Sequence, residues 1–207
     1  DIIYARELGY RIKHLGIARR LPNGLDLRVH PCLVGDDHLL SSVSGVMNAI
    51  VVNGDAVGET LLYGAGAGAQ PTASAVIADL VDVVRTLTSD PGNRVPHLAF
   101  QPAALAAPGI VPLSEIVCAH YLRLTVDDRP GVLADITRIL GDYQVSIEAI
   151  RQQGSADALG NVPVVIVTHR ALEANVAMAV LEIEALSTIA RAATRIRLET
   201  LEISVDE

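Results

Sequence analysis

The chain has 207 residues, a formal net charge of −8 and 50% hydrophobic residues, but only 3% aromatic residues. The acidic balance and the scarcity of aromatic side chains argue against a nucleic-acid-binding surface, which uses basic residues on phosphates and aromatic faces on bases. Cys32 and Cys118, the two cysteines, lie far apart without metal-ligand spacing. We therefore expect a reduced, cytoplasmic setting. No apolar run approaches the roughly 18 residues of a membrane span.

The chain opens with the pattern of a short helix followed by two strands. The helix is expected near residues 1–8, because Asp1 can cap its start and Gly9 can end it. The first strand is expected over 11–19. The letters LPNGL read as a turn and LDLRVHPCLV as the next strand. This order predicts the beginning of a sheet.

An antiparallel pair and a long helix are expected next. AIVVNG and GETLLYG bracket the turn-rich NGDAVG, which is typical of a hairpin. The stretch LLSSVSGVMNA before them fits either a short helix or a loop. The letters PTASAVIADLVDVVRTLT predict an amphipathic helix that opens at Pro71 and Thr72. Residues 1–88 thus predict a mixed sheet with helices on one face, which is an α+β class.

A proline-rich linker over residues 89–115 is expected to separate this first domain from a second one. Residues 116–207 give the order strand, helix, strand, strand, helix, strand. That βαββαβ order predicts a ferredoxin-like plait. The turn DDRPGV joins its first strand to its first helix.

Lys13 is the only lysine among the 16 Lys and Arg residues. Strand alternation places it on one face with Leu15 and Ile17. Arginine keeps its proton in proteins, whereas a desolvated lysine can act as an acid or base. One interpretation is therefore proton transfer at Lys13, and the other is an ordinary solvated charge.

Asp1 and Glu7 precede Lys13, and they could hold an ammonium or hydroxyl group of a ligand. The alternative is that Asp1 only caps the helix and Glu7 only lies on its solvated face. His14, His30 and His38 show no HxxxH pattern. We therefore propose no metal site from the sequence.

The letters YGAGAGAQPTASAV place three glycines between a strand and a helix start. Such a junction lets backbone N–H groups approach an anion or cofactor closely. A Rossmann fingerprint is not expected, because the helix runs into the linker rather than into a second parallel strand. The alternatives are a tight packing turn and a ligand-facing turn.

The letters DDRPGVLADI place a turn before a helix that begins with free N–H groups. The carboxylate of a small amino acid suits that place. The alternative is an ordinary turn in a dimerising plait. The sequence alone leaves both interpretations open.

Taken together, these blocks resemble a known family. DIIYARELGYRIKHLGIARR, LRVHPCLV and GVMNAIVVNGDAVGETLLYGAGAGAQPTASAVIADL are similar to consecutive blocks of bacterial homoserine dehydrogenases. Residues 119–201, with DDRPGVLADI and VSIEAIRQ, resemble an ACT domain, the regulatory module often found at the C-terminus of that enzyme. The two blocks follow each other in the family's order.

The resemblance implies a longer enzyme of threonine, methionine and isoleucine biosynthesis, which interconverts L-homoserine and L-aspartate 4-semialdehyde with NAD or NADP. The cofactor would be bound mainly by an N-terminal domain that this chain lacks. We therefore expect a fragment that is inactive alone and a homodimer or homotetramer. The alternative is a non-catalytic ACT-type amino-acid sensor.

The resemblance also implies roles for particular residues. Lys13 would be the catalytic proton donor, Asp1 would line the substrate site, and Glu7 would be a further, less specific acidic residue there. Three glycines would face the cofactor: Gly64, Gly66 and Gly68.

For the ACT part, the resemblance implies feedback by an amino acid, with threonine the first expectation. The effector site would lie between two ACT domains. Its residues would come from the turn and the helix start: Asp127, Asp128, Pro130, Gly131, Val132 and Leu133.

Overall fold

The computed structural model describes residues 1–88, 103, 105–152 and 156–201. Contacts between Cα atoms divide these residues into two compact units. The first unit contains Asp1–Ser41 and the described residues from Pro108 onward, and the second contains the described residues of Ser42–Ala107.

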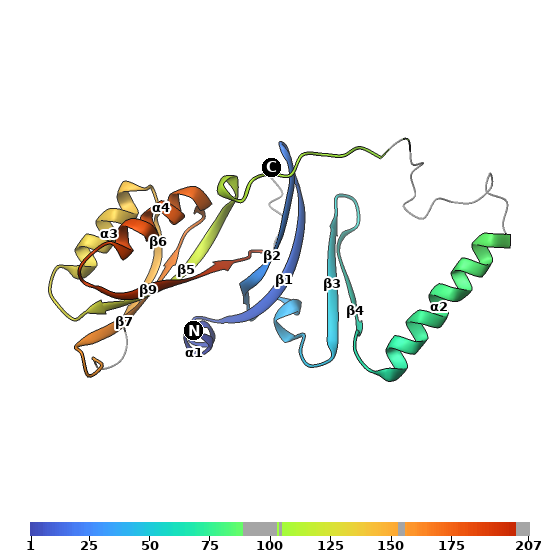
Figure 1. Cartoon of the computed structure of the whole chain (residues 1–207), viewed down its shortest axis with the longest axis horizontal. Helices are drawn as coiled ribbons and strands as arrows, with labels where there is room; N and C mark the ends of the chain where they lie inside the picture. Colours follow the sequence, from blue (N-terminus) through green and yellow to red (C-terminus); the bar gives the residue numbers. More distant parts are fainter. Residues whose placement is uncertain (89–102, 104, 153–155, 202–207) are drawn as a thin grey trace. The chain divides into compact units, whose positions relative to one another are not determined.

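The first unit begins with a helix and a long hairpin (Figure 1). Helix α1 spans Ile2–Glu7, strand β1 spans Tyr10–Leu21, and strand β2 spans Gly24–Gly35. The strands pair in register along their whole length and are joined by a two-residue turn. The expected helix, turn and pair of strands are thus confirmed.

The remaining elements of the first unit follow the predicted βαββαβ order. They are β5 (Val117–Asp127), α3 (Val132–Asp142), β6 (Ile147–Gln152), β7 (Asn161–Thr168), α4 (Glu173–Glu184) and β9 (Ile189–Leu198). A two-residue strand that the sequence did not predict, β8 (Ala171–Leu172), pairs with β5 just before α4. The ferredoxin-like plait is therefore present.

The hairpin and the plait share one mixed sheet, in the order β1-β2-β9-β5-β7-β6. Strand β2 runs parallel to β9, and only two residue pairs form that junction: Cys32 with Arg197, and Leu33 with Leu198. The predicted α+β class with a mixed sheet is confirmed. The contacts group residues 1–41 with the plait, because β2 joins β9, whereas the expected division placed the boundary in the linker at 89–115.

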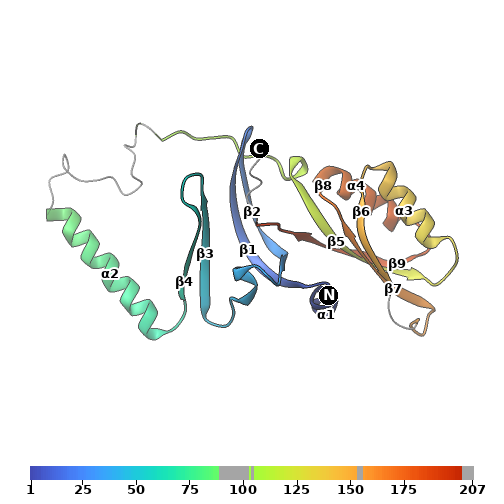
Figure 2. The ribbon, with the colours of Figure 1, turned by 180° about the vertical axis from the view of Figure 1, so that it is seen from behind.

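The two faces of this sheet carry separate cores. Helices α3 and α4 lie together on one side of the sheet, as the two opposite views show (Figures 1 and 2). On one face, side chains of α3 and α4 pack on Leu122 and Leu124 of β5. On the other face, Ala5 of α1 packs with Leu33 and Tyr121. Successive residues of β5 and β7 therefore point to different cores, as strand geometry requires.

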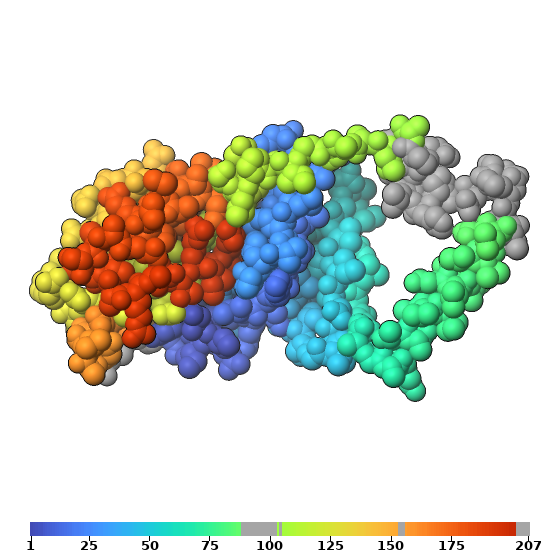
Figure 3. Space-filling view, in the orientation of Figure 1, coloured from blue at the N-terminus to red at the C-terminus, as the bar shows by residue number. Residues whose placement is uncertain are grey.

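The second unit contains an antiparallel pair and a long helix. Strand β3 (Met47–Gly54) pairs with β4 (Gly58–Ala65), as predicted, and helix α2 spans Ala69–Thr88. A short 3₁₀ helix, η1 (Leu39–Ser42), lies in the stretch where the sequence left helix or loop open. The surface of α2, green in Figure 3, includes apolar side chains that are each more than half exposed: Val76, Ile77, Leu80 and Val84.

Most of the predicted linker, residues 89–102 and 104, lies outside the described residues. Its described end runs beside the start of β2. The N–H of Leu25 donates to the carbonyl of Gly109 at 2.9 Å, and the N–H of Val111 donates to the carbonyl of Leu25 at 2.9 Å. The 3₁₀ helix η3 (Leu113–Glu115) then leads into β5. Among the described helices, none is both long and apolar enough to cross a membrane.

Candidate functional site

Lys13 lies in the middle of β1 and is half-buried. Burial alternates along the strand from this residue onward, so Lys13, Leu15 and Ile17 share a face, as the sequence predicted. Lys13 is paired directly with Cys32 of β2. Because paired residues point to the same side of a sheet, Lys13 lies on the face of the Cys32 thiol.

Asp1 binds residues of the plait. Its carboxylate accepts hydrogen bonds from the Tyr121 hydroxyl at 2.9 Å and from Nε of Arg123 at 2.6 Å. Its backbone carbonyl accepts the N–H of Ala5, but its side chain caps no helical N–H. The Asp1 carboxylate therefore fastens the start of α1 to β5.

Glu7 makes a similar link at the other end of α1. Its Oε2 lies 3.4 Å from Nη2 of Arg151 on β6. The two carboxylates that were expected at a substrate site thus join α1 to arginines of the plait. This arrangement gives both residues a structural role.

The structure does not bring Asp1 and Lys13 together. Tyr121, the partner of Asp1, packs in the core under α1 with Leu33. Lys13 lies on the face of Cys32, the residue that precedes Leu33 in β2. Since successive strand residues point to opposite sides, Asp1 and Lys13 lie on opposite faces of the sheet.

Of the three glycines of the predicted cofactor-facing stretch, Gly64 lies near the end of β4, and Gly66 and Gly68 lie between β4 and α2, in the second unit. Gly68 has φ +122, a conformation that side chains other than glycine rarely adopt. A Cβ on Gly66 would collide with the side-chain amide of Asn48. A Cβ on Gly64 would meet nothing within 4 Å, and its backbone is not left-handed. Within the described residues, therefore, neither a lack of room for a side chain nor a left-handed backbone explains why position 64 is a glycine.

The turn predicted to bind an effector closes β5 and opens α3. Gly131 has φ 94 and precedes the helix, and no side chain caps the helix start. The N–H of Asp135 makes the first helical hydrogen bond, to the carbonyl of Gly131. The three preceding N–H groups of the first turn therefore point away from the helix toward the turn. They create a site suited to a carboxylate.

Two carboxylates flank this helix start. Oδ2 of Asp127 lies 3.2 Å from Nη2 of Arg129. Oδ1 of Asp128 accepts a hydrogen bond, 3.5 Å long, from Nε2 of Gln152. Val132 is buried in the core, and Leu133 packs against it. The turn thus offers N–H donors and carboxylate acceptors side by side, which suits the two charges of an amino acid.

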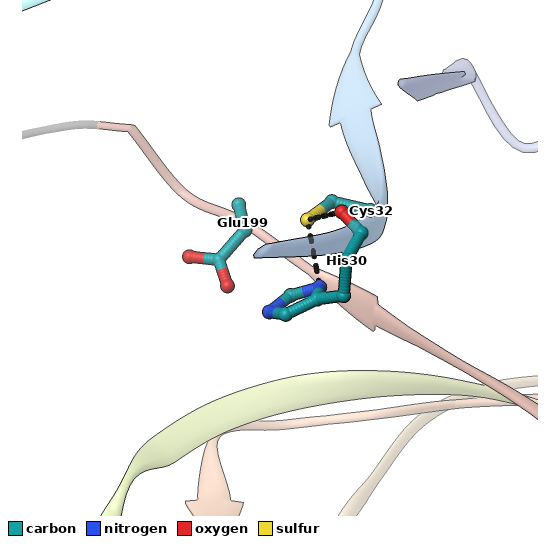
Figure 4. A group of neighbouring side chains, drawn as sticks. All are labelled: His30, Cys32 and Glu199. Atoms are coloured by element: carbon teal, nitrogen blue, oxygen red, sulfur yellow. Dashed lines mark hydrogen bonds between the residues drawn. The ribbon is translucent and has the colours of Figure 1, made fainter. Parts of the chain in front are cut away.

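Sequence reasoning missed a buried charged cluster at the junction of β2 and β9. Arg28 donates to both carboxylate oxygens of Asp26, at 2.7 and 2.9 Å, and to Glu199 at 2.6 Å. The side chains of Arg28 and Glu199 are only 4% and 2% exposed. Figure 4 shows Glu199 facing His30 and Cys32, both from β2, with the thiol directed at the His30 ring.

A second buried cluster lies where β5 meets the first turn of α4. Glu173 Oε2 lies 2.9 Å from Nε2 of His120, and Arg197 donates to both oxygens of Glu173, at 3.0 and 2.6 Å. An ionised carboxylate only accepts hydrogen bonds, so Nε2 of His120 carries the hydrogen. The Sγ atom of Cys118 lies 3.7 Å from Nε2 of His120 and 3.7 Å from Oε2 of Glu173.

The environment of Glu173 favours its ionised form. Burial acts to raise the pKa of this carboxyl, but the hydrogen bonds and charges of His120 and Arg197 outweigh burial and hold the pKa well below its ordinary value. Glu173 is only 3% exposed. A carboxylate is therefore kept charged in the interior by the partners around it.

Both clusters place a thiol, an imidazole and a carboxylate within 4.8 Å of one another, the donor types that zinc uses. Their environment does not suit a cation. Burial raises the pKa of the Cys32 and Cys118 thiols to about 12, so both stay protonated. The carboxylates are already neutralised by Arg28 and Arg197, and a metal ion would add positive charge beside them. The clusters are better described as ion-pair networks.

A sequence signal for these clusters existed. The letters HPC at 30–32 and CAH at 118–120 put a histidine and a cysteine two positions apart. On a strand that spacing puts both side chains on one face. The arginine and glutamate partners come from distant elements, and local spacing could not have shown them.

Comparisons with known proteins match both parts of the chain. Residues 1–81 match the family model described as homoserine dehydrogenase, and residues 120–185 match the ACT domain model. A homoserine dehydrogenase from Pseudomonas aeruginosa is 54% identical over 97% of this chain and 46% of its own length. One from Helicobacter pylori is 41% identical over 96% of the chain and 45% of its own length.

Solved structures show the same similarity. A homoserine dehydrogenase from Thiobacillus denitrificans superposes with a TM-score of 0.88 at 56% identity, covering 98% of this chain and 45% of that protein. One from S. aureus gives a TM-score of 0.57 at 26% identity, covering 98% of this chain and 45% of that protein. The chain thus spans about half the length of the relatives that it matches.

Proposed function

We propose that the chain is the C-terminal part of a homoserine dehydrogenase, because residues 1–81 match the homoserine dehydrogenase family model and residues 120–185 match the ACT domain model. The whole protein would interconvert L-homoserine and L-aspartate 4-semialdehyde in the cytoplasm, with NAD or NADP. The observation that carries this proposal is the 54% identity that extends over 97% of the chain. The pathway would be that of threonine, methionine and isoleucine.

The nicotinamide cofactor would supply or accept the hydride, and most of its binding site would lie outside this chain. The glycine stretch would contribute the remaining contact. Gly64 supports this proposal, because the described residues give no internal reason for a glycine there. A bare backbone at that position lets a ligand approach more closely than any side chain would allow.

Lys13, Asp1 and Glu7 are the residues predicted at the substrate site. Lys13 as proton donor stays a prediction, and its pairing with Cys32 on the face opposite Asp1 offers a structural alternative. Asp1 and Glu7 at the substrate stay predictions as well. Their bonds to Arg123 and Arg151 favour the fastening of α1.

The ACT turn would bind an amino-acid effector, with threonine the first choice. The N–H groups at the start of α3 would hold the carboxylate, and Asp127 and Asp128 would hold the ammonium group. Pro130, Gly131, Val132 and Leu133 would shape the site. A homodimer or homotetramer would place two ACT domains beside each other around the effector.

Calorimetry with L-threonine on this chain tests the effector site. We expect binding heat with the unaltered chain and with Asp142→Asn, an exposed carboxylate at the other end of α3. Asp128→Asn should weaken binding at least tenfold, and D-threonine should not bind. The absence of heat in the unaltered chain, or equal binding by Asp128→Asn, would contradict the proposed site.

The activity is tested on the whole protein from which the chain derives. Purified protein should reduce NAD or NADP when L-homoserine is added, and the isolated 207-residue chain should not. A well-folded whole protein that turns over neither cofactor with L-homoserine would overturn the proposal.

A further inference from the structure

Four side chains form a row of alternating charge across the junction of the hairpin and the ACT sheet; three of them are buried, and the fourth, Arg197, is 15% exposed. In order they are Arg28 of β2, Glu199 directly after β9, Arg197 of β9 and Glu173 of α4; we call them the charged row. Nη1 of Arg28 lies 2.6 Å from Oε1 of Glu199, and Nη2 of Arg197 lies 2.6 Å from Oε1 of Glu173. Glu199 and Arg197 are two positions apart on the same side of the chain.

The backbone junction beside this row is short. Only Cys32 and Leu33 of β2 pair with β9, and the N–H of Glu199 adds one hydrogen bond, 3.0 Å long, to the carbonyl of Leu33. By comparison, β1 pairs with β2 from Tyr10 to Leu21. So few backbone bonds specify the register of a strand only weakly.

The buried charges specify the register of β2 on β9, which the few backbone bonds specify only weakly. A shift of β2 by one residue would turn Arg28 to the other face of the sheet, away from Glu199. A shift by two would separate Arg28 from Glu199 along the strand. Either shift would leave a buried charge without its partner, which costs far more than the intact pair contributes. A single alignment of β2 on β9 therefore pairs Arg28 with Glu199, whereas the pair of Arg197 and Glu173 lies within the plait beside them.

We propose that the charged row is a register lock, which holds the β1–β2 hairpin on the ACT sheet in one alignment so that the two form one body. This inference goes beyond the proposed function, because the lock would operate whatever reaction the whole protein catalyses. It joins residues that match the homoserine dehydrogenase model to residues that match the ACT model. The hairpin would therefore follow any change in the ACT sheet directly.

Amide hydrogen exchange of the 207-residue chain, measured residue by residue, tests the lock. In Arg28→Met the N–H of Glu199, which reports the junction, should exchange at least tenfold faster. The N–H groups of Leu124 and Ile166, in the ACT core, should change by less than about twofold. The matched control is Arg138→Met, which removes an exposed ion pair with Asp142 and should alter neither set.

Two results would overturn the proposal. One is an unchanged rate at Glu199, and the other is an equal acceleration at Glu199 and in the ACT core, which would report general destabilisation only. If Arg28→Met does not fold, Arg28→Lys decides, because lysine keeps the charge but not the forked geometry. The lock predicts faster exchange at Glu199 in Arg28→Lys, and an unchanged rate there refutes it.

Discussion

The carboxylate of Asp1 accepts a 2.6 Å hydrogen bond from Nε of Arg123, a residue more than a hundred positions further along the chain. Arg123 also donates to Thr194 on β9 at 2.7 Å. This network ties α1 to the ACT sheet. Asp1 is also the residue that the resemblance implied at the substrate site, and the network offers a structural role for it instead.

If Asp1 has a structural role, replacing Asp1 and replacing its partner Arg123 should each lower the stability of the fold through the bond that they share. Asp1→Asn and Arg123→Met should each lower the free energy of unfolding by about 1 kcal/mol, because each removes the same partly exposed charged bond. The double variant should lose less than the sum of the two single losses, since the bond between Asp1 and Arg123 is counted in both. Chemical denaturation of the three variants measures this.

The kinetic constants of the whole enzyme provide the control. If Asp1 only fastens α1, its replacement should leave KM for L-homoserine within about threefold of normal, as should Arg123→Met. A large rise of KM in Asp1→Asn alone would instead assign Asp1 to the substrate.

Lys13→Arg separates the two interpretations of the only lysine. If Lys13 has only a structural role, kcat of the whole enzyme should stay within about threefold in this variant, because Lys13 is paired with Cys32 on the face opposite Asp1, where arginine can keep the positive charge. Steady-state kinetics checks this. Loss of turnover by orders of magnitude in a well-folded variant would support the proton-donor role, since arginine cannot release a proton.

Gly64→Ala tests the proposed contact with the cofactor. The added methyl group meets nothing within 4 Å in the described residues, so stability should not change. In the whole enzyme we expect KM for the cofactor to rise about tenfold, because the methyl group would occupy space that the ligand needs. Thermal unfolding and initial rates measure the two effects.

Gly141→Ala is the matched control, because a Cβ there also meets nothing within 4 Å and the residue lies in the other unit. Its KM for the cofactor should stay normal. Equal KM values for Gly64→Ala and the unaltered enzyme would place the glycine stretch away from the cofactor.

Glu173 predicts how stability depends on pH. Its pKa is lower in the folded state than its ordinary value of 4.5, so its contribution is present above pH 4.5 and is lost as the pH falls below that value. At pH 7, Glu173→Gln should reduce the free energy of unfolding by about 3 kcal/mol, because His120 and Arg197 lose a buried partner. Denaturation at several pH values measures the difference.

That difference between Glu173→Gln and the unaltered chain should stay constant from pH 7 to about pH 4.5 and shrink as the pH falls further to about 3, because Glu173 of the unfolded chain takes up a proton there while the folded carboxylate stays charged. Asp142→Asn, which removes an exposed carboxylate, is the control and should show little difference at any pH. A constant difference from pH 7 to pH 3 would contradict the assigned role of Glu173.

Local pattern was sufficient to predict much of this fold. Alternation predicted the strand that carries Lys13 and its shared face with Leu15 and Ile17, and turn residues predicted the hairpins and the βαββαβ order. Such signals lie within a few neighbouring residues.

The parallel pairing of β2 with β9 was not predictable in this way. It joins Cys32 to Arg197, and no local pattern encodes a partner so far along the chain. The same holds for the bond of Asp1 to Arg123 and for the charged row. The roles expected for Asp1 and Lys13 came from the resemblance to a family, and no local pattern showed that the sheet puts the two residues on different faces.

The most direct measurement of the central claim is the activity of a chimera. In it, this chain replaces the matching 46% of the Pseudomonas aeruginosa homoserine dehydrogenase. If the chain is the C-terminal part of such an enzyme, the chimera should oxidise L-homoserine with NAD or NADP within about tenfold of the parent rate. A chimera that folds and assembles like the parent but shows no turnover would contradict the account.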